Sequence, residues 1–241
     1  MRKLIALLSL SLAAPFAAAS TGYYLVTTYP TPGEKTVDFK YWNAKPRGLP
    51  PRSSPELGFG YNVNSRWFTE VSAVWFQLSP GSQKLAAWEW QNDVMLTQGQ
   101  YDHDLALHTT IEREEGDHAL GFEIGPVFQT EIGKTQLNLN VFLQREFRTE
   151  EAQKTELVYQ WQVRQHGLRW FQVGLQGFGE VGPATDWLPR REQSHRAGPA
   201  IFGSIDTGPN QEIRYDAAYL IGKNSGRSAR SVTLRLQYVF R

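Results

Sequence analysis

The sequence predicts an all-β protein: a single antiparallel up-and-down transmembrane β-barrel of about 12 strands, with short periplasmic turns and longer extracellular loops. Three observations predict this fold. The chain ends on a strand, 231–241, whose apolar and polar residues alternate. About twelve segments along the chain share that alternation, and bacterial single-chain barrels have an even number of strands. The connections between the segments also alternate between short and long.

The last segment, SVTLRLQYVFR, shows the pattern most clearly. Successive strand residues point to opposite sides of a sheet, so one face is apolar and the other carries Thr233, Arg235 and Gln237. A strand of this kind with an aromatic close to its end is typical of outer-membrane barrels, and it predicts recognition by the outer-membrane assembly machinery. Arg241 follows Phe240 and departs from the usual aromatic ending. An edge strand of a soluble periplasmic sandwich is the alternative interpretation.

The N-terminus is predicted to be an export signal. Residues 1–19 carry Arg2 and Lys3, then an apolar run, then small residues before Ser20. This is the pattern of a secretory signal peptide that is cleaved. Residues 20–35, with their prolines, are predicted to form an N-terminal periplasmic lead. Residues 36–241 are predicted to form the barrel.

Composition excludes several classes of protein. Without Arg2 and Lys3 the chain has 23 lysines and arginines against 24 acids, so no excess of positive charge predicts binding to nucleic acid. The chain contains no cysteine, which disfavours a small disulfide-stapled domain. No window of eighteen apolar residues follows the signal, so a helical membrane protein is excluded. A barrel remains allowed, because its polar lumen face cancels the apolar face in any average.

Twelve segments are predicted as strands, because each alternates with a period of two and is bounded by turn residues. In order along the chain they are 37–42, 56–61, 69–75, 86–96, 105–112, 120–129, 136–146, 156–165, 171–180, 200–205, 213–221 and 231–241. The clearest internal case is QLNLNVFLQRE at 136–146, where leucine and valine oppose asparagine and glutamine. No segment has the periodicity of a helix.

The connections give an independent argument for the barrel. Those predicted to be short include 64–65, 98–100, 131–134, 165–167 and 206–211, and those predicted to be long include 44–55, 148–154, 182–196 and 223–230. Outer-membrane barrels sort their loops in this way, with short turns in the periplasm and long loops outside. A soluble sandwich has no reason to do so. Aromatic residues such as Trp67, Trp75, Tyr101 and Tyr238 are predicted to lie in part at the two membrane interfaces.

The pattern also resembles a known family. The export signal, the segments PELGFGYNVNSRWFTEVSAVWF and GFEIGPVFQ, and the ending LRLQYVF together resemble the outer-membrane "transporter" barrels grouped with the meta-pathway of phenol degradation. The resemblance covers most of the mature chain. It implies a Gram-negative outer-membrane barrel with a presumed role in substrate transport. No residue with a known role in the family can be matched to a position here.

Motifs of enzyme and metal chemistry do not fit their required context. Gly177, Gly179 and Gly182 spell GxGxxG, but Pro183 follows where a dinucleotide site needs a helix. The histidines have no metal-ligand spacing. Ser194 and His195 are adjacent but face apart if extended, so they do not form a nucleophile and base. We therefore predict no enzyme activity, no metal and no cofactor.

The polar face is predicted to line a lumen with more carboxylates than cations. The inward residues are predicted to be Asp38, Lys40, Glu56, Glu70, Glu89, Asp93, Glu112, Glu123, Glu146, Glu156, Arg164, Glu180, Arg214, Asp216 and Arg235. Two outcomes are open. The charges either leave a narrow aqueous path that favours cations or polar solutes, or they pair into a network that fills the interior.

A second hypothesis concerns the outer loops and the membrane lipid. The residues predicted to contact lipopolysaccharide are Arg190, Arg191, Arg196, Arg227 and Arg230. Guanidinium groups bind phosphates through paired hydrogen bonds, and lipid A carries phosphates. A solvated basic rim is the alternative.

The sequence therefore predicts a passive outer-membrane channel or uptake pore for small solutes of unknown identity. A non-conducting barrel with a structural or surface-binding role is the first alternative. A soluble periplasmic barrel or sandwich is the second.

Overall fold

The computed structural model describes residues 23–27, 31–77, 81–116, 118–149 and 152–241. The predicted signal peptide at 1–19 lies outside these residues. The strands are β1 (Lys35–Pro46), β2 (Arg52–Asn62), β3 (Trp67–Phe76), β4 (Lys84–Met95), β5 (His103–Glu114), β6 (Leu120–Ile132), β7 (Thr135–Phe147), β8 (Glu156–Leu168), β9 (Phe171–Pro183), β10 (Ser194–Gly208), β11 (Gln211–Asn224) and β12 (Arg227–Phe240).

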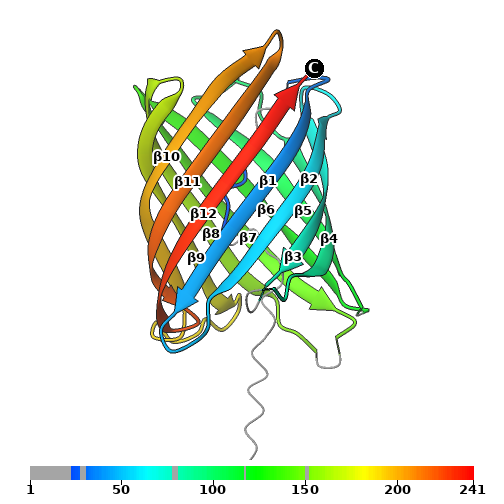
Figure 1. Ribbon diagram of the computed structural model, residues 1–241, viewed down its shortest axis with the longest axis vertical. Coiled ribbons are helices and arrows are strands. Elements are labelled where there is room, and N and C mark those ends of the chain that lie inside the picture. Colours follow the sequence, from blue (N-terminus) through cyan, green and yellow to red (C-terminus); the bar gives the residue numbers. More distant parts are fainter. Residues whose placement is uncertain (1–22, 28–30, 78–80, 117, 150–151) are drawn as a thin grey trace, which may run out of the picture.

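The twelve strands form a closed antiparallel barrel, as the sequence predicted. Each strand pairs with its neighbours in sequence, and β1 pairs with β12 to complete the ring. The strands are long and tilted (Figure 1). Closure leaves no sheet edge with unpaired backbone groups. In the described part of the chain no helix has the length and hydropathy to span a membrane.

The outward face is apolar along nearly all strands. On the QLNLNVFLQRE segment, Leu139 and Leu143 remain 49% and 41% exposed, and none of the described residues forms a second layer over them. These leucines face Trp161 and Leu157 of β8 in register. On this face the Trp67 indole N–H donates to Asn92 Oδ1 at 3.0 Å. This surface is suited to contact with hydrocarbon.

The two rims of the barrel differ. The C-terminal rim, at the top of Figure 1, contains the connections 63–66, 96–102, 133–134, 169–170 and 209–210. The loop rim, at the bottom, contains the described residues of the connections 47–51, 77–83, 115–119, 148–155, 184–193 and 225–226. The loop rim has the longer connections in most cases, as expected.

One predicted long loop is wrong. The segment 223–230 was expected to be a loop, but β11 and β12 are joined by the two residues Ser225 and Gly226. Both have positive φ, 47° and 74°. A two-residue hairpin turn of the I′ type requires positive φ at both positions, so strand pairing continues to the end. The loop predicted at 182–196 also shortens, to 184–193, because β10 begins at Ser194.

The glycines of the GxGxxG motif serve the packing of aromatic side chains on the outer face. A Cβ at Gly177 would lie 2.2 Å from the Trp161 ring, and one at Gly179 would lie 2.2 Å from the Tyr159 ring. The rings lie over the glycines of the next strand. The motif therefore has a structural role in this strand pair and opens no helix.

At Gly125 the neighbouring strands β6 and β7 approach each other closely. A Cβ there would lie 1.9 Å from the backbone carbonyl oxygen of Val141, which no side-chain movement relieves. We expect Gly125→Ala to lower the free energy of unfolding by about 3 kcal/mol, measured by denaturant unfolding in detergent. Gly167→Ala is the control, because its Cβ would meet nothing closer than 3.8 Å. Equal stability of the two variants would contradict this packing.

Candidate functional site in the barrel lumen

A segment that precedes the first strand occupies the lumen. Residues 20–35 were predicted as a periplasmic lead, but the described residues 23–27 lie inside the barrel (Figure 1). Tyr23, Tyr24, Leu25 and Val26 are each at most 8% exposed. They belong to no strand. We call Tyr23–Val26 the lumen segment.

The Tyr23 ring is held between an aromatic ring and a cation. It stacks on Trp42 of β1 with ring centroids 4.2 Å apart and planes 12° apart. The Arg196 guanidinium lies over it, 4.0 Å from the ring centroid. Asn224 Nδ2 donates to the Tyr23 hydroxyl at 2.7 Å. Each such cation–π contact contributes roughly 1–2 kcal/mol when shielded from water.

Tyr24 contacts two further cations of the wall. The Lys40 ammonium lies 4.2 Å from its ring centroid, and the Arg235 guanidinium lies 5.6 Å from it. Both cations also bind carboxylates, so the tyrosine ring covers an ion-paired network. The two tyrosines therefore join the segment to β1, β10 and β12.

The backbone of the segment is bound by polar side chains of the wall. Arg235 Nη1 donates to the Leu25 carbonyl oxygen at 3.2 Å. Asn140 Nδ2 donates to the Val26 carbonyl oxygen at 2.9 Å, and the Val26 N–H donates to Gln160 Oε1 at 3.1 Å. Since unpaired buried backbone groups are costly, these contacts allow a non-sheet segment to be buried here.

Val26 is packed against apolar side chains that point inward. We call them the apolar ladder, because they follow one another across five neighbouring strands: Met95, Ala106, Val127, Phe142 and Val158. Met95 faces Ala106 in register, Ala106 faces Val127, and Phe142 faces Val158. The sequence predicted a polar lumen face, and it did not predict this inward apolar ladder. A second inward apolar group lies on β9, β10 and β11, formed by Phe178, Ala200, Phe202, Ala218 and Leu220.

A buried ion pair joins the two strands that close the barrel. Asp38 of β1 is fully buried and accepts hydrogen bonds from Arg235 of β12, from Nη2 at 2.6 Å and from Nε at 2.9 Å. Gln237 Nε2 adds a third donor at 3.2 Å. A bidentate carboxylate–guanidinium pair has a fixed geometry. It therefore joins the first and last strands in one arrangement.

Lys40 is the centre of a second network. Its ammonium donates to Glu56 Oε1 at 2.6 Å and to Glu70 Oε1 at 2.8 Å. Glu70 is on β3, so its side chain passes over β2 to reach β1. Gly58 permits this, because a Cβ there would lie 2.8 Å from Glu70 Cδ.

His108 links two more of the predicted lumen acids. Its Nδ1 lies 2.6 Å from Asp93 Oδ1 and its Nε2 lies 3.1 Å from Glu123 Oε1. Gln144 also donates to Glu123. The imidazole ring packs 4.7 Å from the Phe142 ring, which belongs to the apolar ladder. The alternation of segment 105–112 puts His108 on the inward face but gives no sign of these partners.

The other predicted lumen residues are placed as follows. Glu89 and Glu112 are buried and face each other in register across β4 and β5. Arg164 donates to Gln172 Oε1 at 2.6 Å. The side chains of Glu146, Glu180 and Asp216 are half-buried. Arg214 lies at the C-terminal rim, 3.2 Å from Glu34 and 2.5 Å from Glu212, and Glu156 is exposed where β8 begins.

Arg196 was predicted in an outer loop, and this is wrong. It is on β10, only 3% exposed, and its Nη2 donates to Glu180 Oε1 at 2.8 Å inside the barrel. The other four arginines of that prediction are exposed at the loop rim. Arg190 and Arg191 lie in the 184–193 connection, and Arg227 and Arg230 lie at the start of β12.

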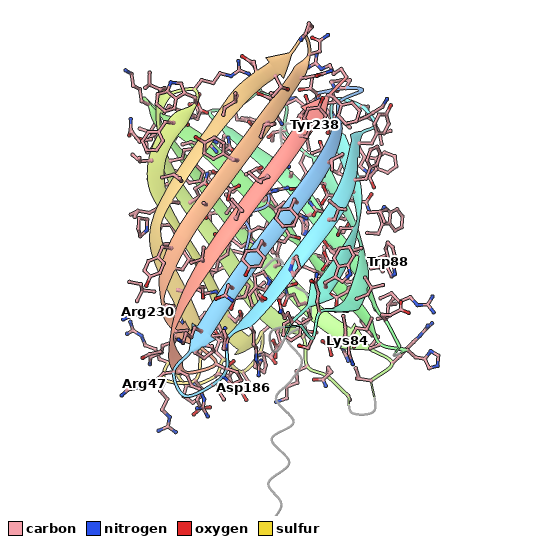
Figure 2. The ribbon with its side chains drawn as sticks, viewed as in Figure 1. Arg47, Lys84, Trp88, Asp186, Arg230 and Tyr238 are labelled. Carbon is pink, nitrogen blue, oxygen red and sulfur yellow. The ribbon has the colours of Figure 1, made fainter. Side chains whose placement is uncertain are left out.

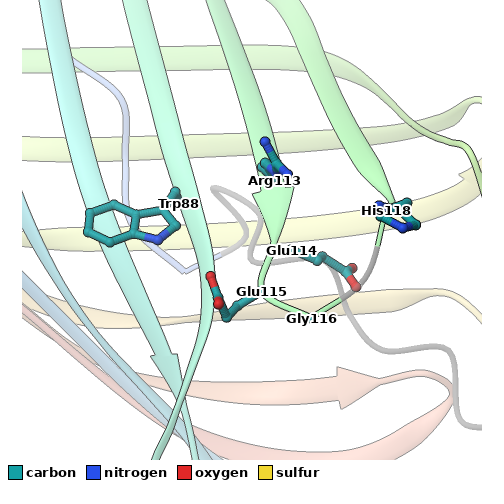
Figure 3. Close-up of a pocket in the computed structure, with 6 residues that line it drawn as sticks. All are labelled: Trp88, Arg113, Glu114, Glu115, Gly116 and His118. Carbon is teal, nitrogen blue, oxygen red and sulfur yellow. The ribbon is translucent and has the colours of Figure 1, made fainter.

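A small cavity lies beside the lumen segment. A cavity of about 10 Å³ lies beside Tyr23, Tyr24, Lys40, Trp42 and Asp216, which is about the space of one water molecule. A larger hollow, of about 500 Å³, lies at the loop rim beside the outward-facing Trp88 and Arg113 and the residues Glu114, Glu115, Gly116 and His118 (Figure 3). Among the described residues, no three histidines or acids are placed to hold a metal ion.

Solved structures share this architecture. The chain is similar to an outer membrane channel from Pseudomonas putida F1, with a TM-score of 0.62 and 8% identity over 90% of this chain and 99% of that one. It is also similar to the KdgM porin in complex with disordered oligogalacturonate, with a TM-score of 0.56 and 8% identity over 86% of this chain and 98% of that one. A third similar structure is the translocator domain of autotransporter NalP from Neisseria meningitidis, with a TM-score of 0.53 and 9% identity over 88% of each chain.

The fold is that of outer-membrane β-barrels. No protein-family model and no curated protein sequence matches the chain. Membership of the meta-pathway family therefore rests on the sequence pattern alone. At 8–9% identity these outer-membrane barrels show the architecture and carry no residue roles to this chain.

Proposed function

We propose that this protein is a passive outer-membrane channel for small solutes, and that the lumen segment keeps it closed. The C-terminal rim then faces the periplasm and the loop rim faces outward. The apolar outward face and the closed, charged interior support this placement. The likeness of the sequence to the meta-pathway barrels agrees with a role in uptake.

One observation supports the closed channel above all: a segment outside the sheet fills the lumen. Strand pairing fixes the wall through continuous backbone hydrogen bonds, whereas Tyr23–Val26 is held by side chains and by three backbone contacts. Such a segment can leave while the barrel stays intact. A lumen filled by wall residues alone would have no such route to opening.

The charges of the wall indicate which solutes the open channel favours. Glu56, Glu70, Glu89 and Glu112 lie on the neighbouring strands β2 to β5 and are all buried. Of the inward cations, Lys40 and Arg235 each pair with acids of β1 to β3. The remaining excess of carboxylates favours cations and neutral polar solutes over polyanions.

The excess of carboxylates in the wall predicts that the open channel is selective for cations. We expect the protein without residues 23–27 to conduct cations in preference to anions, measured by the reversal potential across a planar bilayer in a KCl gradient. Replacing Glu89 and Glu112 by glutamine is expected to move the cation-to-anion permeability ratio toward one. The matched control replaces Glu115 and Glu131, which are exposed at the rims, and should keep the ratio.

The non-conducting barrel is the rival function, and the filled lumen also favours it. It predicts no discrete current steps from the intact protein or from the protein without residues 23–27. Steady steps from the shortened protein would exclude it.

A further inference from the structure

We propose that the outer face of β1 and β12 at the loop rim binds a phosphate group of lipid A through Lys45, Arg47 and Arg230. This inference rests on the outer-membrane placement proposed above, but it does not require that the barrel conducts. The earlier hypothesis for the basic rim was based on loop arginines. The structure points instead to a site where the closing strands β1 and β12 meet the 47–51 connection.

Two cations of the site lie directly opposite each other on neighbouring strands. Lys45 of β1 and Arg230 of β12 are cross-strand partners in register, and both are exposed. Such partners have Cβ atoms about 5 Å apart, and like charges in this position destabilise a sheet. Arg47 lies two residues beyond Lys45 on the same face, where its N–H donates to the Ser228 carbonyl oxygen at 2.8 Å. The repulsion is relieved if an anion lies between the three cations.

The two chain segments that carry these cations contain no acid to supply that negative charge. Residues 43–54 and 221–230 contain six lysines and arginines and not one aspartate or glutamate. In the described part of the chain no ion pair joins Lys45, Arg47 or Arg230 to a carboxylate. The C-terminal rim is different, because Arg169 there pairs with Asp206 at 2.6 Å and with Glu212 at 2.9 Å. One rim neutralises its cations within the protein, and this part of the other rim does not.

The surface next to the cations is suited to acyl chains. Along β1, the outward face between the rims is formed by Val37, Phe39 and Tyr41, and along β12 it is formed by Val232, Leu234, Leu236 and Tyr238. Asn43 separates this apolar strip from Lys45. Figure 2 shows Arg47 and Arg230 together at the end of the strip, on the same side of the loop rim. A ligand with acyl chains and a phosphate can contact both the apolar strip and the cations beside it. A free anion would contact the cations alone.

The test measures the lipid bound by the folded protein in detergent, by native mass spectrometry. The probes are bis-phosphorylated lipid A, the same lipid without phosphates, and inorganic phosphate. We expect Lys45→Gln, Arg47→Gln and Arg230→Gln together to weaken binding of the phosphorylated lipid by about tenfold or more. The matched control, Lys35→Gln, Arg66→Gln and Lys134→Gln, removes the same charge from exposed positions at the C-terminal rim and should bind as the natural protein does.

A charge-keeping variant, Lys45→Arg with Arg230→Lys, should retain binding and shows that a loss is due to charge. Equal binding by the triple variant and the natural protein would overturn the site. So would an equal loss in the control, equal binding of the dephosphorylated lipid, or binding of inorganic phosphate as strong as that of lipid A. A protein that conducts but binds no lipid A contradicts this inference alone, and a silent barrel that binds it contradicts only the proposed channel.

Discussion

Removal of residues 23–27 is expected to turn a nearly silent barrel into a conducting one. Tyr23, Tyr24, Leu25 and Val26 fill the middle of the lumen with side chains that are at most 8% exposed. Strand register fixes where each wall side chain is attached, so we do not expect wall side chains to fill the vacated space. A twelve-stranded ring is wider than an eight-stranded one, whose interior its own side chains fill. Planar-bilayer recording should show discrete current steps for the shortened protein and rare openings for the intact one.

The double substitution Tyr23→Ala and Tyr24→Ala is expected to give an intermediate result. It removes contacts with Arg196 and Lys40, and two contacts of about 1 kcal/mol each change the ratio of open to closed channels by about 30-fold. Tyr61→Ala with Tyr101→Ala is the control, because both rings lie exposed outside the lumen.

A chemical measurement checks the same opening without current. The chain has no cysteine, so a single Leu25→Cys reports on the lumen segment through its rate of reaction with a polar maleimide. The reaction should be slow in the otherwise natural protein and faster with both tyrosines replaced. If the shortened protein stays silent and Leu25→Cys reacts equally in both backgrounds, the segment does not close a channel.

The outward half of this structure could be predicted from the sequence, because lipid imposes one rule on it. The outward positions Leu137, Leu139, Val141 and Leu143 of segment 136–146 are all apolar, so period-two alternation identifies both the strand and its face. Inward positions hold both polar and apolar residues, so no single pattern identifies them. Met95, Ala106 and Val127 interrupt the polar pattern one at a time along the chain, and only the strand register brings them into one ladder.

The lumen segment and Arg196 were missed for related reasons. Tyr23–Val26 has no alternation, since it pairs with no strand, and an apolar run before Pro30 looks like an extended lead. Arg196 precedes Gly198 and Pro199, which indicate a loop. In the structure Gly198 allows a close approach of strands, because a Cβ there would lie 1.9 Å from the Tyr219 carbonyl oxygen. The signal for a lumen occupant was therefore an unexplained apolar group before the first strand, together with inward apolar residues that needed a partner.

Breaking the pair of Asp38 and Arg235 is expected to have the largest effect on stability. Asp38 is fully buried and receives two hydrogen bonds from Arg235 across the seam of β1 and β12. Removing one partner leaves the other charge buried without compensation, which costs about 3–5 kcal/mol. Asp38→Asn and Arg235→Gln should each lower the free energy of unfolding by that amount, measured by denaturant unfolding in detergent. The double variant should lose less than the sum of the two, because neither charge then remains.

The outer face of the same two strands supplies the control. Lys45→Gln with Arg230→Gln changes an exposed register pair on β1 and β12, so the free energy of unfolding should change by no more than about 0.5 kcal/mol.

The two single variants of the buried pair should also differ in conductance. Arg235→Gln removes the hydrogen bond to the Leu25 carbonyl oxygen and should open the channel more often than Asp38→Asn. Additive losses in the double variant would show that the two residues act independently, and the seam would then depend on backbone pairing alone.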